Sequence, residues 1–118
     1  MTLDAYLMIL VARKLIAQGW TQHAFARDVD GNEVSAFARR AVRWSLTGAL
    51  DVATAKFPAK SIEARIAVHT ALDILGAGRG DDWNNRPDTA RADVLYLLEA
   101  AMNTRISAAG GEVLQTSP

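Results

Sequence analysis

The chain has 118 residues, half of them hydrophobic, which is enough for one folded domain with its own core. Its 13 basic and 13 acidic residues balance, and this disfavours a nucleic-acid partner, because neutralising phosphates takes an excess of Lys and Arg. There is no cysteine, which excludes disulfides, a thiol nucleophile and cysteine-ligated metals and makes the cytoplasm the expected compartment.

The first predicted element is a helix from Leu3 to Gln18. Thr2 is a good N-cap, Asp4 suits the positive end of the helix dipole, and Gly19 can end the helix. Residues 5–12 are almost all apolar, and we therefore expect this helix to be central and covered on most sides. The apolar run is far shorter than the roughly 20 residues of a membrane span. Neither a membrane partner nor a targeting segment is expected.

A short β-hairpin is predicted next, from Ala24 to Val29 and from Asn32 to Ser35. The residue pattern alternates there, and Asp30-Gly31 is a favoured two-residue turn. A hairpin alone is marginal in water, and it must therefore pack on the helices. We expect its anchors to be Phe25, Val29 and Val34.

The second predicted helix runs from Ala36 to Ala55, with Ser35 as its cap. Gly48, in its middle, marks either a close contact or a break, because glycine is unfavourable inside a helix. The residues expected on its buried face are Phe37, Ala41, Val42, Trp44, Ala49 and Leu50.

Two more helices are predicted, from Ile62 to Leu75 and from Asp88 to Ile106. Ser61 caps the first, whose expected buried residues are Ile62, Ile66, Val68, Leu72 and Leu75. Pro87 cannot lie inside a helix, and Asp88 is therefore the expected N-cap of the second. The predicted fold is mainly α: a compact four-helix domain, residues 1–107, with one small β-hairpin inserted after helix one. Residues 108–118 are expected to form a flexible C-terminal tail.

The linker 76–87 is long for a small domain, and such linkers are often functional. It carries Trp83, Asn84, Asn85 and Arg86, which offer a stacking surface, amide groups and a planar cation for a polar ligand or a peptide. The alternative is structural: Trp83 fills the core, and the amides bond turn backbone.

A second polar segment follows the first helix and contains Trp20, Gln22, His23 and Asp28. We expect the two tryptophan-bearing segments to meet at one end of the helical bundle. The predicted site is a polar-aromatic patch of Trp20, Gln22, Asp28, Trp83, Asn84, Asn85 and Arg86. It makes the protein a non-enzymatic interaction or ligand-binding module, with a protein or a small polar ligand as partner. Here too the structural alternative stays open, because a Trp after a helix-ending Gly often closes the helix end.

Two other functions remain open. A cofactor-independent hydrolase or lyase would use Asp28, His23 or His69 as acid or base, although no nucleophile is evident. A nucleic-acid binder would use Arg39, Arg40 and Arg43 on one helix face. No metal-ligand motif occurs, and we expect no metal and no cofactor and assign no catalytic residue. A homodimer is left open.

Several short motifs together resemble a known family. They are Gly-Trp-Thr-Gln at 19–22, Ala-Arg-Asp at 26–28, Trp-Ser-Leu-Thr-Gly-Ala-Leu at 44–50 and Trp-Asn-Asn at 83–85. In these residues the chain resembles a family of short bacterial and phage proteins of unknown function, over about residues 5–101. The resemblance implies a compact accessory protein with the Gly-Trp-Thr-Gln and Trp-Asn motifs as its signature, and it implies no catalytic residue.

Overall fold

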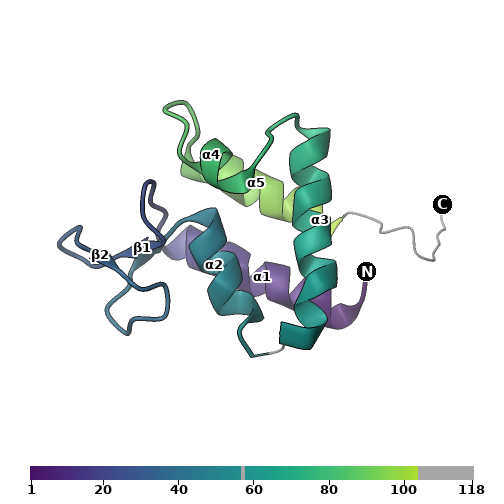
Figure 1. The fold of residues 1–118 in the computed structure, drawn as a ribbon, viewed down its shortest axis with the longest axis horizontal. Coiled ribbons are helices and arrows are strands. Elements are labelled where there is room, and N and C mark those ends of the chain that lie inside the picture. The colour runs from purple at the N-terminus through teal and green to yellow at the C-terminus, as the bar shows by residue number, and fades with distance from the viewer. Residues whose placement is uncertain (57, 104–118) are drawn as a thin grey trace.

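The computed structural model describes residues 1–56 and 58–103, whose arrangement is shown in Figure 1. The described helices are α1 (Leu3–Gln18), α2 (Leu46–Thr54), α3 (Ser61–Ile74), α4 (Gly80–Asn84) and α5 (Arg91–Met102), and a 3-10 helix, η1 (Pro58–Lys60), precedes α3. The strands are β1 (Ala26–Arg27), β2 (Glu33–Val34) and β3 (Arg43–Trp44). The mainly helical class is confirmed. The described chain nevertheless has five α-helices instead of four, and a third strand joins the hairpin.

Helix α1 has the bounds that the sequence predicts. Thr2 Oγ1 accepts a hydrogen bond from the Ala5 backbone N–H (3.2 Å), and the Gly19 N–H donates to the Leu15 carbonyl (3.1 Å). Both ends of the helix are therefore satisfied locally, which is why the sequence alone located them. The helix lies behind α2 in Figure 1, and it packs on α2, α3 and α5.

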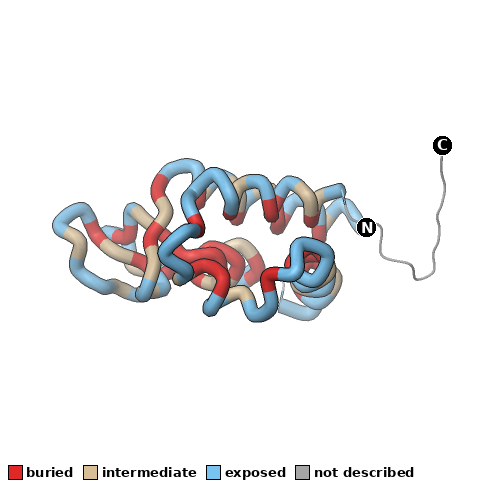
Figure 2. Tube along the Cα trace, turned by 90° about the horizontal axis from the view of Figure 1, so that it is seen from above, coloured by how far each residue is buried: buried red, intermediate tan, exposed pale blue. Residues whose placement is uncertain are grey.

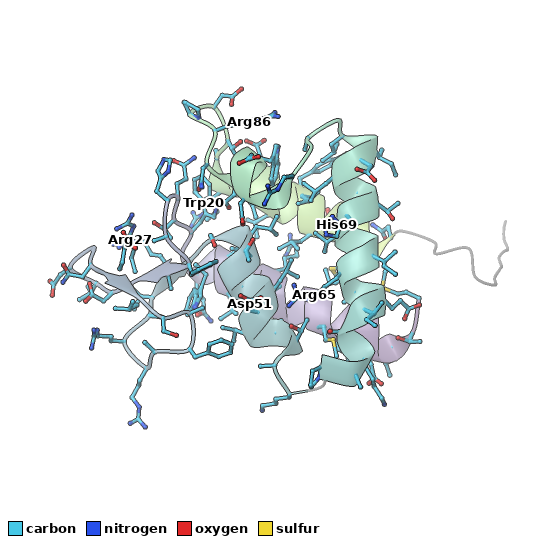
Figure 3. All side chains as sticks on the ribbon, viewed as in Figure 1. Trp20, Arg27, Asp51, Arg65, His69 and Arg86 are labelled. Carbon is cyan, nitrogen blue, oxygen red and sulfur yellow. The ribbon has the colours of Figure 1, made fainter. Side chains whose placement is uncertain are left out.

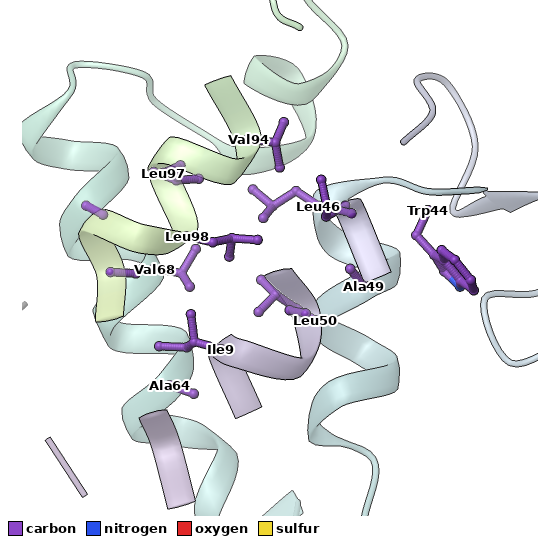
Figure 4. Close-up of a cluster of buried hydrophobic side chains, with 14 of the residues drawn as sticks. Ile9, Trp44, Leu46, Ala49, Leu50, Ala64, Val68, Val94, Leu97 and Leu98 are labelled. Atoms are coloured by element: carbon purple, nitrogen blue, oxygen red, sulfur yellow. The ribbon is translucent and has the colours of Figure 1, made fainter. Parts of the chain in front are cut away.

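The hydrophobic core lies between α1, α2, α3 and α5, where their buried sides face each other (Figure 2). Ile9, Leu50, Val68 and Leu98 come from these four helices and meet in its centre (Figure 4). Burying one such side chain contributes roughly 1.5–3 kcal/mol. This cluster therefore holds the four longest helices together and leaves α4 and the sheet at the periphery.

The predicted second helix begins at Leu46 instead of Ala36. The residues between them form a loop and β3, which pairs antiparallel with β1 and gives the sheet order β2-β1-β3. The Trp44 indole N–H donates to the Ala36 carbonyl (3.0 Å) and ties the loop to the strand. The short, mostly apolar segment 41–44 is compatible with a helix or a strand, and its pairing with β1 makes residues 43–44 a strand.

Ser45, and not Ser35, is the N-cap of α2. Its Oγ accepts a hydrogen bond from the Gly48 N–H (3.1 Å), whereas Ser35 Oγ accepts from the Phe37 N–H in a turn. A Cβ on Gly48 would lie 2.1 Å from the Phe25 carbonyl oxygen. Gly48 therefore marks a close contact, between the first turn of α2 and the backbone next to β1.

The hairpin of β1 and β2 is shorter than predicted, and of its three expected anchors Val34 alone packs against the core. Ala26 is fully buried, whereas Phe25 is 58% and Val29 is 74% exposed. Successive strand residues face opposite sides, and burial of Ala26 therefore turns Phe25 outward.

Helix α3 nearly coincides with its prediction, but its packing does not. Val68 and Leu72 are buried as expected, whereas Ile62, Ile66 and Leu75 are largely exposed. The helix instead packs through alanines at positions 64, 67 and 71. Small residues at a helix contact let the two helix axes come closer, and the larger side chains then stay outside.

The predicted linker contains α4, and the last helix starts at Arg91 instead of Asp88. The Thr89 hydroxyl donates to the Trp83 carbonyl (2.7 Å), which attaches the turn to α4. Helix α5 then begins after Ala90. The expected end at Ile106 and the expected tail, residues 108–118, lie outside the described residues, and the predicted 1–107 domain is described to residue 103. Within the described chain, every helix falls short of the length and apolar character that crossing a bilayer requires.

Candidate functional site

Asn84 is the centre of a hydrogen-bonded junction between distant segments. Only 1% of its surface is exposed. Its Oδ1 accepts from the Trp20 indole N–H (2.9 Å) and the Leu46 backbone N–H (3.0 Å), and its Nδ2 donates to the Thr21 carbonyl (3.2 Å) and to Asn85 Oδ1 (3.2 Å). A carboxamide offers two acceptor and two donor positions, and all four are used. Asn84 thus joins the loop after α1 to the ends of α2 and α4.

Gln22 and Asn85 form a second layer of this junction. Gln22 Nε2 donates to the carbonyls of Asn84 (3.0 Å) and Arg86 (2.8 Å), and Asn85 Oδ1 also accepts from the His23 backbone N–H (2.8 Å). His23 has a φ of 63°, a left-handed conformation that costs a non-glycine residue about 1–3 kcal/mol. The hydrogen bond to Asn85 stabilises this conformation and fixes the direction of the loop.

The predicted patch is divided. Trp20, Gln22, Asn84 and Asn85 come together in the junction, whereas the Trp83 side chain is buried and Arg86 contributes only its backbone carbonyl, which accepts a hydrogen bond from Gln22 (Trp20 and Arg86 are labelled in Figure 3). The Arg86 guanidinium donates to a backbone carbonyl in the loop before α4 (3.1 Å). Trp83 and Arg86 line a separate cavity of about 410 Å³. The two tryptophans therefore do not share one binding surface.

Asp28 lies apart from the junction, in the turn between β1 and β2. Its Oδ1 accepts hydrogen bonds from the backbone N–H groups of Asn32 (2.9 Å) and Asp30 (3.0 Å), and Arg40 lies 3.7 Å from its Oδ2. The bond from the Asn32 N–H is the main reason that the pKa of Asp28 lies below its ordinary value, although burial opposes the shift. Asp28 shapes the turn and does not contact the junction.

A pocket of about 450 Å³ lies beside the junction, and we call it the junction pocket. It is lined by His23, Ala24, Phe25, Glu33, Ser45, Asp81, Asn84 and Asn85. Pockets that hold small molecules usually measure roughly 300–1,000 Å³, and the junction pocket falls within this range. Three exposed side chains in its wall, those of His23, Phe25 and Glu33, make no hydrogen bond within the described residues, whereas the Asp81 carboxylate accepts one from the Thr47 hydroxyl.

Three residues in this wall could not be recognised as site residues from the sequence. Glu33, Ser45 and Asp81 were not predicted, and Phe25 was expected to be buried. Ser45 precedes a helix and Asp81 lies in a short acidic segment, but such signals are common and indicate no site. The three residues meet because β1 pairs with both β2 and β3 and because Asn84 binds the start of α2.

The three residues considered as acid or base do not share a cavity. His23 lines the junction pocket, His69 lines a groove between α2 and α3, and Asp28 lies in the hairpin turn. Among the described residues, no three His, Asp or Glu side chains are grouped so that they could hold a metal ion.

The helix face expected to carry Arg39, Arg40 and Arg43 does not form, because α2 starts only at Leu46. Arg40 pairs with Asp28, and the Arg43 guanidinium donates to the Asp28 carbonyl (3.1 Å). These two arginines therefore stabilise the hairpin turn through Asp28.

One protein family matches nearly all of the described fold. The model described as "Family of unknown function (DUF6197)" matches residues 2–104, from α1 to α5, and includes every residue of the junction. No curated protein and no solved structure matches the chain. The chain therefore belongs to DUF6197, a family of unknown function.

Proposed function

We propose that this protein is a non-enzymatic binding module that holds a cationic group, an ammonium or a guanidinium, in the junction pocket. The cation would belong to a small polar ligand or to a side chain of a partner protein. The observation that carries the proposal is that an exposed aromatic ring and two carboxylates line one pocket of suitable size.

The charge of the lining favours a cation. Glu33 and Asp81 each contribute a carboxylate, and none of the lining residues is Lys or Arg. The amide of Asn85 and the imidazole of His23 add hydrogen-bonding groups at the edge. An ammonium or guanidinium group donates hydrogen bonds and carries the opposite charge, and it therefore fits both features.

Phe25 supplies an aromatic face for the same cation. Its ring is 58% exposed, and core packing therefore does not explain it. A cation over an aromatic ring gains about 0.5–1 kcal/mol at an exposed site and about 2 kcal/mol when water is excluded.

The junction holds one side of this pocket rigid before a ligand arrives. Asn84 uses all of its hydrogen-bonding positions within the protein, and the loop that carries His23 is fixed by Asn85. Binding to an ordered wall loses less conformational entropy than binding to a mobile loop, and affinity rises accordingly.

Butylammonium and butylguanidinium are suitable probes, followed by backbone amide chemical shifts in NMR, with butyrate as the probe of opposite charge. We expect shifts at residues 22–25 and 84–85 for both cations and not for butyrate. Phe25→Ala should weaken cation binding about two- to fivefold, since it removes the ring, and Glu33→Gln should also weaken it. The matched control is Phe37→Ala, because Phe37 is 61% exposed and lies outside the pocket. Equal affinities in the two Phe→Ala variants would refute the proposal.

A second candidate is a cofactor-independent hydrolase or lyase with His23 as acid or base. The observation that favours it is that His23 lines the same pocket as the carboxylates of Glu33 and Asp81. A panel of small ester and amide substrates tests it. Turnover that disappears in His23→Gln, while cation binding persists, would favour the enzyme over the binding module.

The compartment that we propose is the cytoplasm of a bacterial cell. This rests on the resemblance to short bacterial and phage accessory proteins and on the absence of cysteine from the sequence.

A further inference from the structure

A second cavity, between α2 and α3, has a different wall from the junction pocket. Its volume is about 240 Å³, and we call it the interhelix groove. Leu46 and Leu50 from α2 and Val68 and Leu72 from α3 line it, and each of the four is at most 6% exposed. These side chains give the groove an apolar floor, and an apolar part of a ligand would lose its contact with water there.

Basic side chains also line the groove. Arg65 and His69 come from α3 (Figure 3), and Arg79 comes from the residue before α4. Arg65 is engaged with α2, since its guanidinium donates to Asp51 (3.1 Å) and to the Thr54 hydroxyl (3.0 Å). Within the described part of the chain, no hydrogen bond or ion pair engages the side chain of His69 or of Arg79. Their donors are available to a ligand.

One acidic side chain, Asp81, also lines the groove. Its Oδ1 accepts a hydrogen bond from the Thr47 hydroxyl, which holds the carboxylate against α2. Arg65 is paired with Asp51 and Asp81 is bonded to Thr47, and the donors left without a partner in the described chain are therefore those of Arg79 and His69. These donors favour an anionic group in the groove.

We propose that the interhelix groove binds a short aliphatic carboxylate. The aliphatic tail lies on the floor formed by Leu46, Leu50, Val68 and Leu72, and the carboxylate accepts hydrogen bonds from Arg79 and His69. A guanidinium matches a carboxylate with two parallel hydrogen bonds, which gives Arg79 the leading role.

The volume sets the length of the ligand. At roughly 30 Å³ for each heavy atom, the share of one water molecule in the liquid, the groove holds about eight heavy atoms. Hexanoate has this size. The inference does not depend on the proposed function, because the junction pocket favours the opposite charge and is lined by other residues except Asp81.

The test compares three probes with the same six-carbon tail: hexanoate, 1-hexanol and hexylammonium. For a ligand of this size we expect hexanoate to bind with a Kd on the order of 1 mM. NMR amide shifts identify the site, and hexanoate should move residues 46–50, 65–72 and 79–81. 1-Hexanol should bind the same residues more weakly, and hexylammonium should not move residues 65–72.

Substitutions distinguish the contribution of the basic side chains to binding from that of the apolar floor. Arg79→Gln should lower the affinity for hexanoate about tenfold, which is the effect of losing a charge-assisted hydrogen bond. The affinity for 1-hexanol should stay unchanged. His69→Gln should lower the affinity for hexanoate by a smaller factor than Arg79→Gln does. The matched control is Arg39→Gln, which removes the same charge from an exposed residue outside the groove and should leave hexanoate binding unchanged. The inference is overturned if hexanoate moves no groove residue, if it binds no better than 1-hexanol, or if the Arg39 and Arg79 variants lose equal affinity.

Discussion

Replacing Asn84 by Ala should destabilise the fold, although the residue was first considered for ligand binding. The substitution removes the acceptor of the Trp20 indole N–H and of the Leu46 backbone N–H, and also the donor to the Thr21 carbonyl. The bonds to Leu46 and Thr21 are buried. Two segments that lie far from Asn84 in the sequence, residues 20–21 and the start of α2, therefore lose their common partner.

The expected loss follows from these two buried bonds. A buried polar group left without a partner costs about 1–3 kcal/mol, and two such groups would cost about 2–6 kcal/mol. Water can enter the space left by the carboxamide and satisfy part of this need, and we therefore expect the free energy of unfolding to fall by about 3 kcal/mol. Small domains have only about 5–15 kcal/mol of stability, and the variant should remain folded but weakened.

Urea unfolding followed by circular dichroism measures this loss. With a slope near 1.5 kcal/mol per M urea, the midpoint should fall by about 2 M without a change in slope. The control is Asn103→Ala, because the Asn103 amide donates to the Glu99 carbonyl on the surface, and its removal should cost less than about 0.5 kcal/mol. A midpoint for Asn84→Ala equal to that of the control would show that the junction contributes no stability.

Gly48→Ala should destabilise the protein by about 1–3 kcal/mol in the same urea assay, because the new Cβ would meet the Phe25 carbonyl oxygen at 2.1 Å. Gly80→Ala is its control, because there the new Cβ would meet only ordinary side-chain contacts at 3.5 Å. The free energy of unfolding of this variant should rise by up to about 1 kcal/mol. A loss as large as that of Gly48→Ala would contradict the reasoning. The pKa values of Asp28 and Glu63 lie below their ordinary values, Asp28 mainly through the Asn32 N–H and Glu63 mainly through a hydroxyl hydrogen bond. The stability that these carboxylates contribute is present above their ordinary pKa values of 3.8 and 4.5 and is lost as the pH falls through the lower folded-state values. The thermal midpoint should therefore drop less steeply below about pH 4.5 in an Asp28→Asn, Glu63→Gln variant than in the unsubstituted protein, and parallel curves would refute this.

The proposed ligands of the two cavities also give a joint expectation. Asp81 lines both the junction pocket and the interhelix groove, with its Oδ1 bonded to Thr47. Asp81→Asn should weaken binding of a cation in the pocket and strengthen binding of hexanoate in the groove, because the same negative charge attracts one ligand and repels the other. Changes of the same sign for both probes, in a variant that remains folded, would contradict the assignment of opposite charges.

Features that depend on neighbouring residues were predictable from the sequence alone. Thr2 and Gly19 bound α1 correctly, and α3 agrees with its prediction to within one residue at each end. The Thr2 cap and the Gly19 stop act over one helical turn, and a linear pattern contains that information. The caps expected at Ser35, Ser61 and Asp88 were wrong, because the N-cap residues of these helices are Ser45, Lys60 and Ala90. The mainly helical class followed from the same signals.

The tertiary structure decided which segments pair and which side chains are covered. Residues 43–44 form a strand because they pair with β1, and Ala26 is buried instead of Phe25 because neighbouring residues of an extended segment face opposite sides. The role of Asn84 was likewise invisible in the sequence, since its partners lie 38 to 64 residues away, apart from its neighbour Asn85. An amide in a predicted loop can bind a ligand or make hydrogen bonds inside the protein. Which of the two it does depends on the donors and acceptors that the folded chain places beside it. Only the packed chain determines that.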